Sequence, residues 1–443
     1  MGRLRSDPAV PGSRGYLTML KAGTIEASYV VETPLDPEKV AAIMAGEQSS
    51  GTFVRVAGET DELRERAAAT VLFVQEPEPA ERPSLTSAYL ERKQVSGPWR
   101  RAHIRIAFPI ANIGANLPTL ASTVSGNLFD LGEVTGLRLV DVSVPQSYRS
   151  RFDLPRLGVA GTRETLGVQD RPLFGTIIKP NVGMRAHEIA DLVSVLCEAG
   201  VDFIKDDEIC ADPDHAPLAD RVPAVMAVIR AYRERTGRDV MMAFNITDET
   251  DAMRRHAELV EKEGGSCVMA SLNWCGLSAM QTLRRSTPLA LHGHRNGYGA
   301  FARHPALGIG FDAYQALYRL AGVDHMHVHG IGGKFSDAAE EVEAGARRCL
   351  QPLAVDAPDA TDAVLPAFSS GQWAGTLPVT AQAAGSSDFL FMAGGGILAH
   401  PDGPAAGVRS LRQAWEAVAE KRDLKEAAAT KPELAAALGF FGA

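Results

Sequence analysis

The stretch Val201-Asp202-Phe203-Ile204-Lys205-Asp206-Asp207-Glu208 is the most informative segment of the sequence. Its apolar start is typical of a buried strand, and the strand ends in one lysine followed by three carboxylates. Strand alternation would place Lys205 and Asp207 on one face, with Glu208 just beyond. Such a group is either a structural ion-pair cluster or a site for a hard cation such as Mg2+, which prefers oxygen ligands. If CO2 carbamylated the lysine, its side chain would become a third acidic ligand.

The same pattern of a short apolar strand ending in polar residues recurs through the second half of the chain. Eight strands are expected, at Phe174–Lys179, Val201–Lys205, Val240–Asn245, Cys267–Leu272, Leu289–His294, His325–His329, Val364–Ser369 and Phe389–Ala393. Helical stretches fit between them, and eight β/α units over roughly 250 residues predict a closed (β/α)8 TIM barrel. Chemistry in such barrels lies at the carboxyl ends of the strands, which favours a metal site at Lys205 over a simple ion-pair cluster.

The first half of the chain has a different pattern of expected strands and helices. Strands are expected at Ala27–Glu32, Ala69–Val74 and Arg101–Phe108, with a helix beginning after Asp36-Pro37. The predicted fold class is therefore α/β. It comprises a flexible tail over residues 1–15, an N-terminal α+β (ferredoxin-like) domain over 16–150, and the barrel with C-terminal helices over 151–443.

Composition narrows the class of protein. The 443 residues include 45 basic and 54 acidic side chains, a net charge of -9, and no long basic run, so no nucleic-acid partner is expected. No apolar stretch reaches the roughly 18 residues needed to span a bilayer, so no membrane association is expected. The 5 cysteines are odd in number and lack CxxC spacing, which favours a cytoplasmic location over a disulfide scaffold or a zinc site.

Glycine-rich segments follow three of the later strands. Backbone N–H groups of Gly394-Gly395-Gly396 could close on a phosphate, as barrels often do after strands seven and eight. Ser369-Ser370-Gly371 would add hydroxyl and backbone donors. Gly330-Ile331-Gly332-Gly333-Lys334 is typical of a mobile loop that carries one cation over a bound anion, with an ordinary exposed loop lysine as the alternative.

Histidines cluster at the ends of the fifth and sixth strands. His292-Gly293-His294-Arg295 places a guanidinium beside two histidines, an arrangement that suits phosphate or carboxylate recognition. His325-Met326-His327-Val328-His329 repeats the alternation. Some of these five side chains are expected to be hydrogen-bonded core histidines rather than catalytic groups.

Together these segments resemble the large subunit of ribulose bisphosphate carboxylase over nearly the whole chain. The resemblance implies that carbamylated Lys205, Asp207 and Glu208 bind Mg2+, with CO2 incorporated as the carbamate. Gly175-Thr176-Ile177-Ile178-Lys179-Pro180-Asn181 resembles the strand-one motif, which implies a catalytic role for Lys179.

The resemblance extends to both domains. Glu47-Gln48-Ser49-Ser50-Gly51-Thr52-Phe53 and Ser125-Gly126-Asn127 resemble pieces that complete a neighbouring subunit's site, which implies a homodimer with shared active sites. His294 is implied as a proton carrier, and Glu47 and Lys334 as catalytic residues. The implied substrate- and phosphate-binding residues are Thr52, Asn127, Arg295, His327, Ser370, Gly371, Gly394 and Gly395.

Several positions depart from the family pattern. Asn181 replaces a second lysine and Gln372 a glycine; Ile177 replaces a threonine, Phe53 a tryptophan, and Val328-His329-Gly330 a Ser-Gly-Thr. Because these positions frame the phosphates and enediol of a bisphosphate, we expect a ribulose bisphosphate carboxylase-like protein that is not a genuine carboxylase.

Glu47 and Lys334 sharpen the functional prediction, since they match the pair that contacts the CO2-derived carboxylate in true carboxylases. Their retention suggests a substrate that bears or loses a carboxylate. We predict enolate formation from a phosphorylated sugar-acid, by a decarboxylase or transcarboxylase/hydrolase of a 3-oxo acid phosphate such as 3-oxo-isoapionate 4-phosphate. The alternative functions are a methionine-salvage enolase or isomerase acting on a methylthio-sugar phosphate, and a non-catalytic binding protein. A ketose phosphate is the alternative class of substrate.

Overall fold

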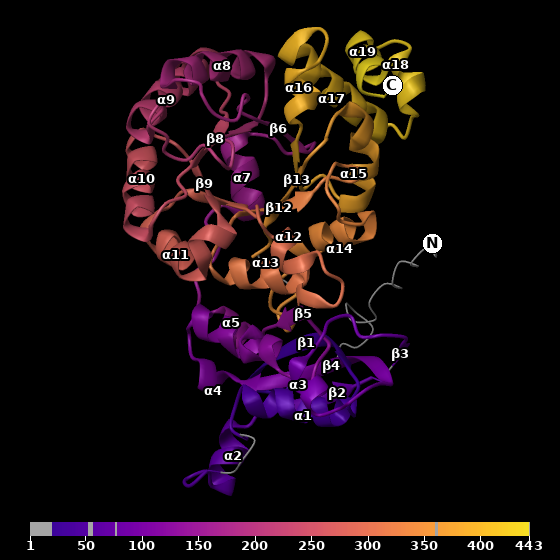
Figure 1. The fold of residues 1–443 in the computed structure, drawn as a ribbon. Helices are drawn as coiled ribbons and strands as arrows, with labels where there is room; N and C mark the ends of the chain where they lie inside the picture. Colours follow the sequence, from indigo (N-terminus) through magenta and orange to yellow (C-terminus); the bar gives the residue numbers. More distant parts are fainter. Residues whose placement is uncertain (1–19, 52–55, 76–77, 359–361, 443) are drawn as a thin grey trace.

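A computed structural model describes residues 20–51, 56–75, 78–358 and 362–442 of the chain. Figure 1 shows two domains, a barrel ringed by helices and a smaller domain built on a sheet below it. The predicted tail over residues 1–15, together with Thr52 and Phe53, lies outside the described residues.

Eight parallel strands close into the predicted barrel. In spatial order they are β6 (Leu173–Ile177), β7 (Phe203–Lys205), β8 (Met241–Asn245), β9 (Cys267–Ser271), β10 (Ala290–His294), β12 (His325–His329), β13 (Leu365–Ser369) and β14 (Leu390–Met392). All eight predicted strands are therefore confirmed, with ends that move by one or two residues. Leu173, Phe203, Met241 and Leu365 belong to a buried apolar cluster contributed by these strands, so the barrel interior is a packed core and polar chemistry is left to its mouth.

Helices surround the barrel in the order that the sequence predicts. They are α8 (Ala186–Ala199), α9 (Leu218–Thr236), α10 (Thr250–Lys262), α11 (Leu272–Ser286), α13 (Phe311–Leu320), α14 (Ala339–Cys349) and α15 (Leu377–Ala384). In α8, Ile189, Val193 and Leu196 recur at helical spacing and are buried, and the helix ends at Gly200 with φ 86°. In α11, two helical segments run together across a kink at Gly276.

Shorter elements complete the barrel domain. They are α7 (Gly158–Leu166) before the first barrel strand, α12 (Gly299–Ala302), η2 (Ala374–Thr376) and α16 (Gly394–Leu398), followed by α17 (Gly403–Ala419), α18 (Leu424–Ala428) and α19 (Pro432–Phe441). Figure 1 places α17 to α19 beside α15 and α16, at one edge of the barrel domain. The predicted glycine triplet therefore opens α16, directly after the last strand.

The N-terminal domain is an antiparallel sheet with helices, in agreement with the predicted α+β class. Its strands are β1 (Thr24–Thr33), β2 (Thr70–Val74), β3 (Glu78–Ala80), β4 (Trp99–Pro109) and β5 (Gly136–Ser143). Its helical elements are α1 (Pro37–Glu47), α2 (Asp61–Ala67), α3 (Ala88–Arg92), α4 (Ile110–Ile113), α5 (Leu117–Ser125), η1 (Asn127–Asp130) and α6 (Gln146–Arg149). One further strand, β11 (Leu307–Ile309), comes from the barrel half and pairs in parallel with β5, so it ties the two domains together.

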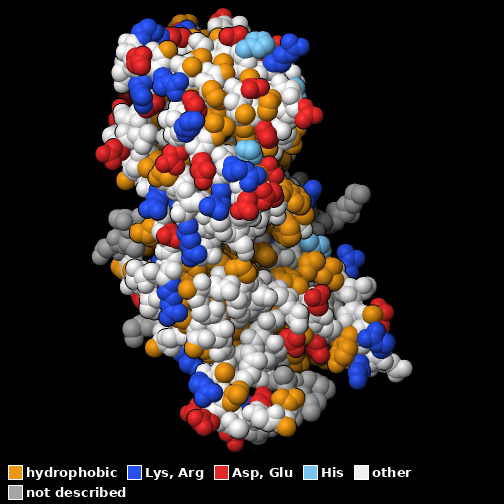
Figure 2. Space-filling view, turned by 90° about the vertical axis from the view of Figure 1, so that its left-hand side faces the viewer, with side chains coloured by type: hydrophobic (Ala, Val, Ile, Leu, Met, Phe, Trp, Pro, Cys, Tyr) orange, Lys and Arg blue, Asp and Glu red, His pale blue; other side chains and the backbone are white. Residues whose placement is uncertain are grey.

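On the face drawn in Figure 2, Lys and Arg side chains are interspersed with Asp and Glu rather than gathered into a basic stripe. Among the described residues, no helix is long and apolar enough to cross a bilayer.

Buried carboxylates hold the amino-terminal end of the barrel together. Asp324, which precedes β12, is fully buried and accepts hydrogen bonds from the backbone N–H groups of Leu157, Gly158 and Leu291 at 2.6, 2.8 and 2.7 Å. Its second oxygen also pairs with Arg284, 3.0 Å away and equally buried. One carboxylate thus satisfies donors from three segments that are distant in sequence.

Replacing Asp324 by Ala should destabilise the protein by ~3–5 kcal/mol, because the change leaves Arg284 charged, buried and without its partner. The loss is measured as a shift of the urea unfolding midpoint followed by circular dichroism. Glu234→Ala, an exposed position on α9, serves as the control and should stay within about 0.5 kcal/mol of the parent. An Asp324→Ala protein as stable as the parent would contradict the assignment of this carboxylate as a structural tie.

Candidate active site at the barrel mouth

Lys205 is the last residue of β7 and lies at the centre of the site. Its side chain is only 1 % exposed, and its Nζ donates to the carbonyl of Asp206 at 3.0 Å and lies 3.8 Å from Glu208 Oε2. Burial lowers the pKa of the Lys205 ammonium, although Glu208 and Asp207 act in the opposite direction. The buried position therefore favours the neutral amine, which is the form of lysine that reacts with CO2.

Asp207 and Lys179 form the second part of the site. Lys179, just beyond β6, donates from Nζ to Asp207 Oδ2 at 2.8 Å and to Asn181 Oδ1 at 2.6 Å. Asn181, which stands where the family has a lysine, thus serves here as an acceptor for the remaining one. Asn245 holds the Asp207 backbone in place, because its Nδ2 donates to the Asp207 carbonyl at 3.0 Å.

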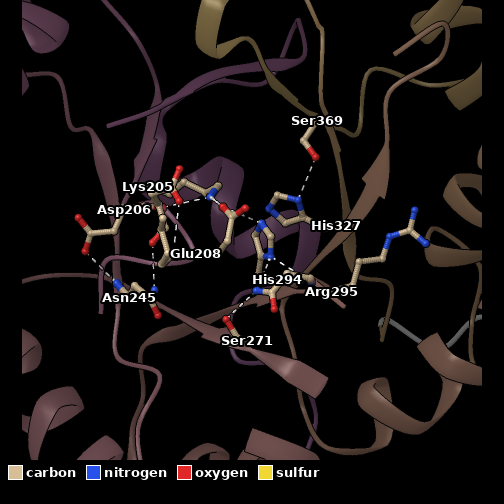
Figure 3. Close-up of polar contacts among 12 residues, drawn as sticks. Lys205, Asp206, Glu208, Asn245, Ser271, His294, Arg295, His327 and Ser369 are labelled. Atoms are coloured by element: carbon tan, nitrogen blue, oxygen red, sulfur yellow. Dashed lines mark hydrogen bonds and ion pairs between the residues drawn. The ribbon is translucent and has the colours of Figure 1, made fainter. Parts of the chain in front are cut away.

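The three consecutive carboxylates do not act as one cluster. Asp206 turns away from the mouth, pairs with buried Arg221 at 3.3 Å and accepts from the Asn245 N–H at 2.9 Å. Figure 3 shows Asp206 directed toward Asn245, while Lys205 and Glu208 face His294 and His327. Asp206 therefore belongs to a structural ion pair. Asp207 and Glu208 lie at the mouth, where a metal site was expected.

The number of acidic ligands is limited at this position. Among the described residues, no group of three or more His, Cys, Asp or Glu side chains is arranged to hold a metal ion. Asp207 and Glu208 instead stand with the amine of Lys205, so a three-ligand oxygen site requires Lys205 itself to supply an oxygen.

His294, at the end of β10, has a defined proton position. Its Nδ1 faces two donors of Asn296, the backbone N–H at 3.2 Å and Nδ2 at 3.1 Å, while its Nε2 lies 3.6 Å from Glu208 Oε2. The Asn296 amide is oriented by Trp274, whose indole N–H donates to Oδ1. His294 therefore accepts at Nδ1 and carries its proton at Nε2, toward Glu208. Burial, followed by the Lys205 charge, lowers the pKa of His294 well below its usual value, which keeps the ring neutral.

Three further histidines form a hydrogen-bonded chain under the site. Thr162 donates to the Gly158 carbonyl, so its oxygen can only accept from His325 Nε2, 2.8 Å away. His325 Nδ1 then accepts from His292 Nδ1 at 3.3 Å, and His292 Nε2 accepts from His327 Nε2 at 2.7 Å. His327 Nδ1 is left to accept from the Ser369 hydroxyl at 3.1 Å. Each ring is neutral, and each has one nitrogen that donates and one that accepts a hydrogen bond.

Arg295 is paired with a residue that the sequence analysis did not single out. Its Nη2 lies 2.8 Å from Asp337 Oδ2, and the same carboxylate oxygen lies 2.6 Å from His329 Nδ1. Figure 3 shows the Arg295 side chain extending away from Lys205 and Glu208. Asp337 follows Lys334 by three residues, but a lone aspartate in a predicted loop carried no signal that would have identified it.

The loops after β12 and β13 pack tightly against each other. Ser370 and Gly371 both have positive φ, 78° and 65°, and the Ser370 hydroxyl is buried without a protein partner. Gln372 Nε2 donates to the Ser370 carbonyl at 2.9 Å, and a side chain at Gly330 would collide with the Gln372 amide. The predicted Ser370 is thus held in a strained conformation with a free donor at the mouth.

The remaining predicted residues are not gathered at the Lys205 cluster. Glu47 ends α1 and accepts from Asn127 Nδ2 at 3.1 Å, within the N-terminal domain that lies below the barrel in Figure 1. Lys334 lies on the loop after β12, with Nζ 5.3 Å from the centre of the Phe335 ring. Gly394 and Gly395 lie at the start of α16, and a Cβ at Gly395 would meet no atom within 4 Å.

Replacing His325 by Gln should reduce the loss of stability that the protein suffers on acidification. Burial lowers the pKa of His325 to about 4, so between pH 6.5 and 4 the unfolded chain binds more protons and stability rises with pH. Without His325, the drop in unfolding free energy from pH 7 to pH 5 should shrink by about 2 kcal/mol. Urea titrations at both pH values provide the measurement. His187→Gln, an exposed histidine on α8, should leave the pH dependence unchanged; an unaltered slope in His325→Gln would refute the neutral-chain assignment.

Comparison with known proteins agrees with this geometry. The family description "Ribulose bisphosphate carboxylase large chain, catalytic domain" matches residues 158–441, and that of the N-terminal domain matches residues 25–148. The chain is 46% identical over 417 residues to a 3-oxo-isoapionate-4-phosphate transcarboxylase/hydrolase of Xanthobacter autotrophicus, covering 94% of this chain and 99% of the relative. It is 42% identical over 420 residues to a 3-oxo-isoapionate-4-phosphate decarboxylase of Rhizobium rhizogenes, covering 94% and 98%. The crystal structure of a rubisco-like protein from Burkholderia fungorum superposes with a TM-score of 0.89 at 64% identity, covering 94% of this chain and 100% of the other. The chain therefore belongs to the ribulose bisphosphate carboxylase large-chain family, as one of its RuBisCO-like proteins.

Proposed function

We propose that this protein is a Mg2+-dependent enzyme that forms an enolate from a phosphorylated 3-oxo sugar-acid and acts as a decarboxylase or transcarboxylase/hydrolase. The observation that carries the proposal is the convergence of Lys205, Asp207, Glu208 and Lys179 at the barrel mouth. The two relatives named above, one a transcarboxylase/hydrolase and one a decarboxylase of 3-oxo-isoapionate 4-phosphate, support this class of substrate.

The residues present fit a magnesium site. Asp207 and Glu208 supply carboxylate oxygens, and the buried amine of Lys205 would gain an oxygen anion by adding CO2 and releasing a proton. Bound Mg2+ would act as a Lewis acid that polarises a substrate carbonyl and stabilises negative charge on its oxygen.

Lys179 and His294 would stabilise the negative charge that develops on the substrate during the reaction. The Lys179 ammonium, held by Asp207 and Asn181, would donate a hydrogen bond to the oxygen on which charge develops as the carboxylate departs. His294 carries its proton at Nε2 toward the mouth, so the neutral ring can donate a hydrogen bond to a developing enolate oxygen but cannot accept a proton at that nitrogen. This orientation favours a reaction that generates the enolate by loss or movement of CO2 over one that begins by proton removal at His294.

Two copies of the chain would complete each site. Glu47 and Asn127 contact each other in the N-terminal domain, apart from the barrel cluster, while the matching Lys334 lies on the loop after β12. Large apolar side chains are exposed on the segments that follow the barrel strands: Val182, Ile209, Trp274, Phe301 and Phe335. A ring of this kind around a mouth is typical of a surface covered by a partner, and the N-terminal domain of a second copy would cover it.

Incubation of the purified protein with 3-oxo-isoapionate 4-phosphate, Mg2+ and bicarbonate should yield CO2 release or hydrolysis of the transcarboxylated product, and chelation of the metal should abolish turnover. Lys334→Ala should lower the rate about 100-fold, because the loop cation would no longer hold the carboxylate. Lys262→Ala, an exposed lysine on α10, is the matched control and should retain the parent rate.

The outcome also separates the alternatives. A methionine-salvage enolase or isomerase would turn over a methylthio-sugar phosphate and would lose little enolisation in Lys334→Ala. A non-catalytic binding protein would show no metal-dependent turnover with either substrate.

Mixing two inactive variants should restore activity if the sites are shared between subunits. Glu47→Gln and Lys205→Met each inactivate every site of their own homodimer. After unfolding and refolding of an equal mixture, half of the dimers would be mixed, and each mixed dimer would contain one site with neither change. Turnover should recover to about a quarter of the parent rate.

A second mixture provides the control for this test. Lys205→Met and Lys334→Ala would both lie on the barrel side of the site, so no mixed dimer would contain an unaltered site and turnover should not recover. Equal recovery in both mixtures, or none in the first, would rule out sites built from Glu47 of one subunit and Lys205 of the other.

A further inference from the structure

We propose that Asp337 closes the Arg295 end of the site to a phosphoryl group, so that the enzyme takes a monophosphate whose other end is uncharged and hydroxyl-bearing. This inference rests on the proposed function, because it specifies the charge distribution of that substrate. It revises the expectation that Arg295, His327 and Ser370 bind an anionic end. It also assigns a role to Asp337, which belongs to none of the motifs quoted above.

The Arg295 guanidinium is already neutralised within the protein. Asp337 Oδ2 lies 2.8 Å from its Nη2, and the His329 and Arg295 interactions hold the pKa of Asp337 at about 2 against the opposing effect of burial. Arg295 is also fixed in place, because its guanidinium lies 4.9 Å from the centre of the Tyr298 ring and 4.8 Å from that of Phe311. A phosphoryl dianion arriving here would meet a carboxylate already bound to the cation it needs.

The His329 ring lies beside Asp337, although its Nδ1 makes no hydrogen bond of good geometry there. His329 is the last residue of β12, its Nδ1 lies 2.6 Å from Asp337 Oδ2, and its ring packs on Phe335 with 4.4 Å between the ring centres. The loop that begins at Gly330 is thus tied back to the strand from which it leaves. The carboxylate is a built part of the site rather than a freely rotating surface group.

His327 has no N–H group left for a phosphate. The direction of the histidine chain, set by the Thr162 hydroxyl, commits the His327 proton at Nε2 to His292. Its other nitrogen, Nδ1, accepts from Ser369. An anion needs donors, and the ring offers none to the mouth.

Ser370, on the loop after β13, has a hydroxyl group that no described protein group uses. Its hydroxyl is buried and unpartnered, and it can donate to and accept from another hydroxyl. Together with a neutral Arg295–Asp337 pair, which offers both donors and an acceptor, it is complementary to a polar but uncharged group. A single phosphate is therefore left for Gly394 and Gly395, the glycines after β14 that the sequence predicts to bind phosphate.

Binding of two matched probes tests this assignment without turnover. Ribitol 5-phosphate and ribitol 1,5-bisphosphate have the same chain length and differ by one phosphoryl group. The parent protein, with Mg2+ present, should bind both with dissociation constants within about threefold of each other in calorimetric titration. Asp337→Asn keeps the shape of the side chain but frees the Arg295 charge, and it should bind the bisphosphate about tenfold or more tightly than the parent does.

Three further results decide the outcome. Adding Arg295→Met to Asp337→Asn should remove the gain, while Glu340→Gln, an exposed carboxylate nearby on α14, should produce none. Preference of the parent for the bisphosphate by tenfold or more, or no gain in Asp337→Asn, would overturn the inference and leave the proposed function standing. Failure of the parent and every variant to bind either probe would overturn both.

Discussion

Closure of the eight-stranded barrel is the constraint on which the site depends. It brings the carboxyl ends of β6, β7 and β10 to one mouth, so that Lys179, Lys205 and His294 come together although 115 residues separate the first from the last. The interior below them is packed with apolar side chains and with the hydrogen-bonded histidines, so the Lys205 amine is buried. The low proton affinity of that amine is therefore a consequence of where β7 ends in the barrel.

The histidine chain shows how a distant helix contact sets the chemistry of the mouth. The Thr162 hydroxyl in α7 is committed to its own helix, and this single choice propagates through His325 and His292 to His327. Four neutral rings then lie near one buried amine, so neither they nor Lys205 add a positive charge that would need a counter-ion. Positive charge is carried instead by Lys179 and by Lys334 on the loop after β12. These two groups are suited to bind a substrate carboxylate or oxyanion.

Much of the fold was predictable because the barrel strands are short apolar runs with polar ends, and this period is visible in the sequence. β11 was not, since three residues carry no periodicity and their partner, β5, belongs to the other domain. Within the site, Lys205, Asp207 and Glu208 were predictable from residue type and spacing. The separation of Asp206 from them was not, because it depends on Arg221 of α9. Likewise, the proton positions of His294 and His327 depend on Asn296 and Thr162, which no motif connects to them.

The departures from the family pattern are physically coupled rather than independent. Gln372 replaces a glycine and is buried, and its amide occupies the space that a side chain at position 330 would need; that position is itself a glycine here instead of a threonine. The loop after β13 thus carries the larger side chain at this contact, and the loop after β12 carries the glycine. In the loop after β12, Asp337 pairs with Arg295 and contacts His329, the last residue of β12. A change in one of these residues alone would leave a clash, a cavity or an unpaired buried charge, so we infer that the Arg295 end was remodelled as a unit while the Lys205 end kept its enolate-forming groups.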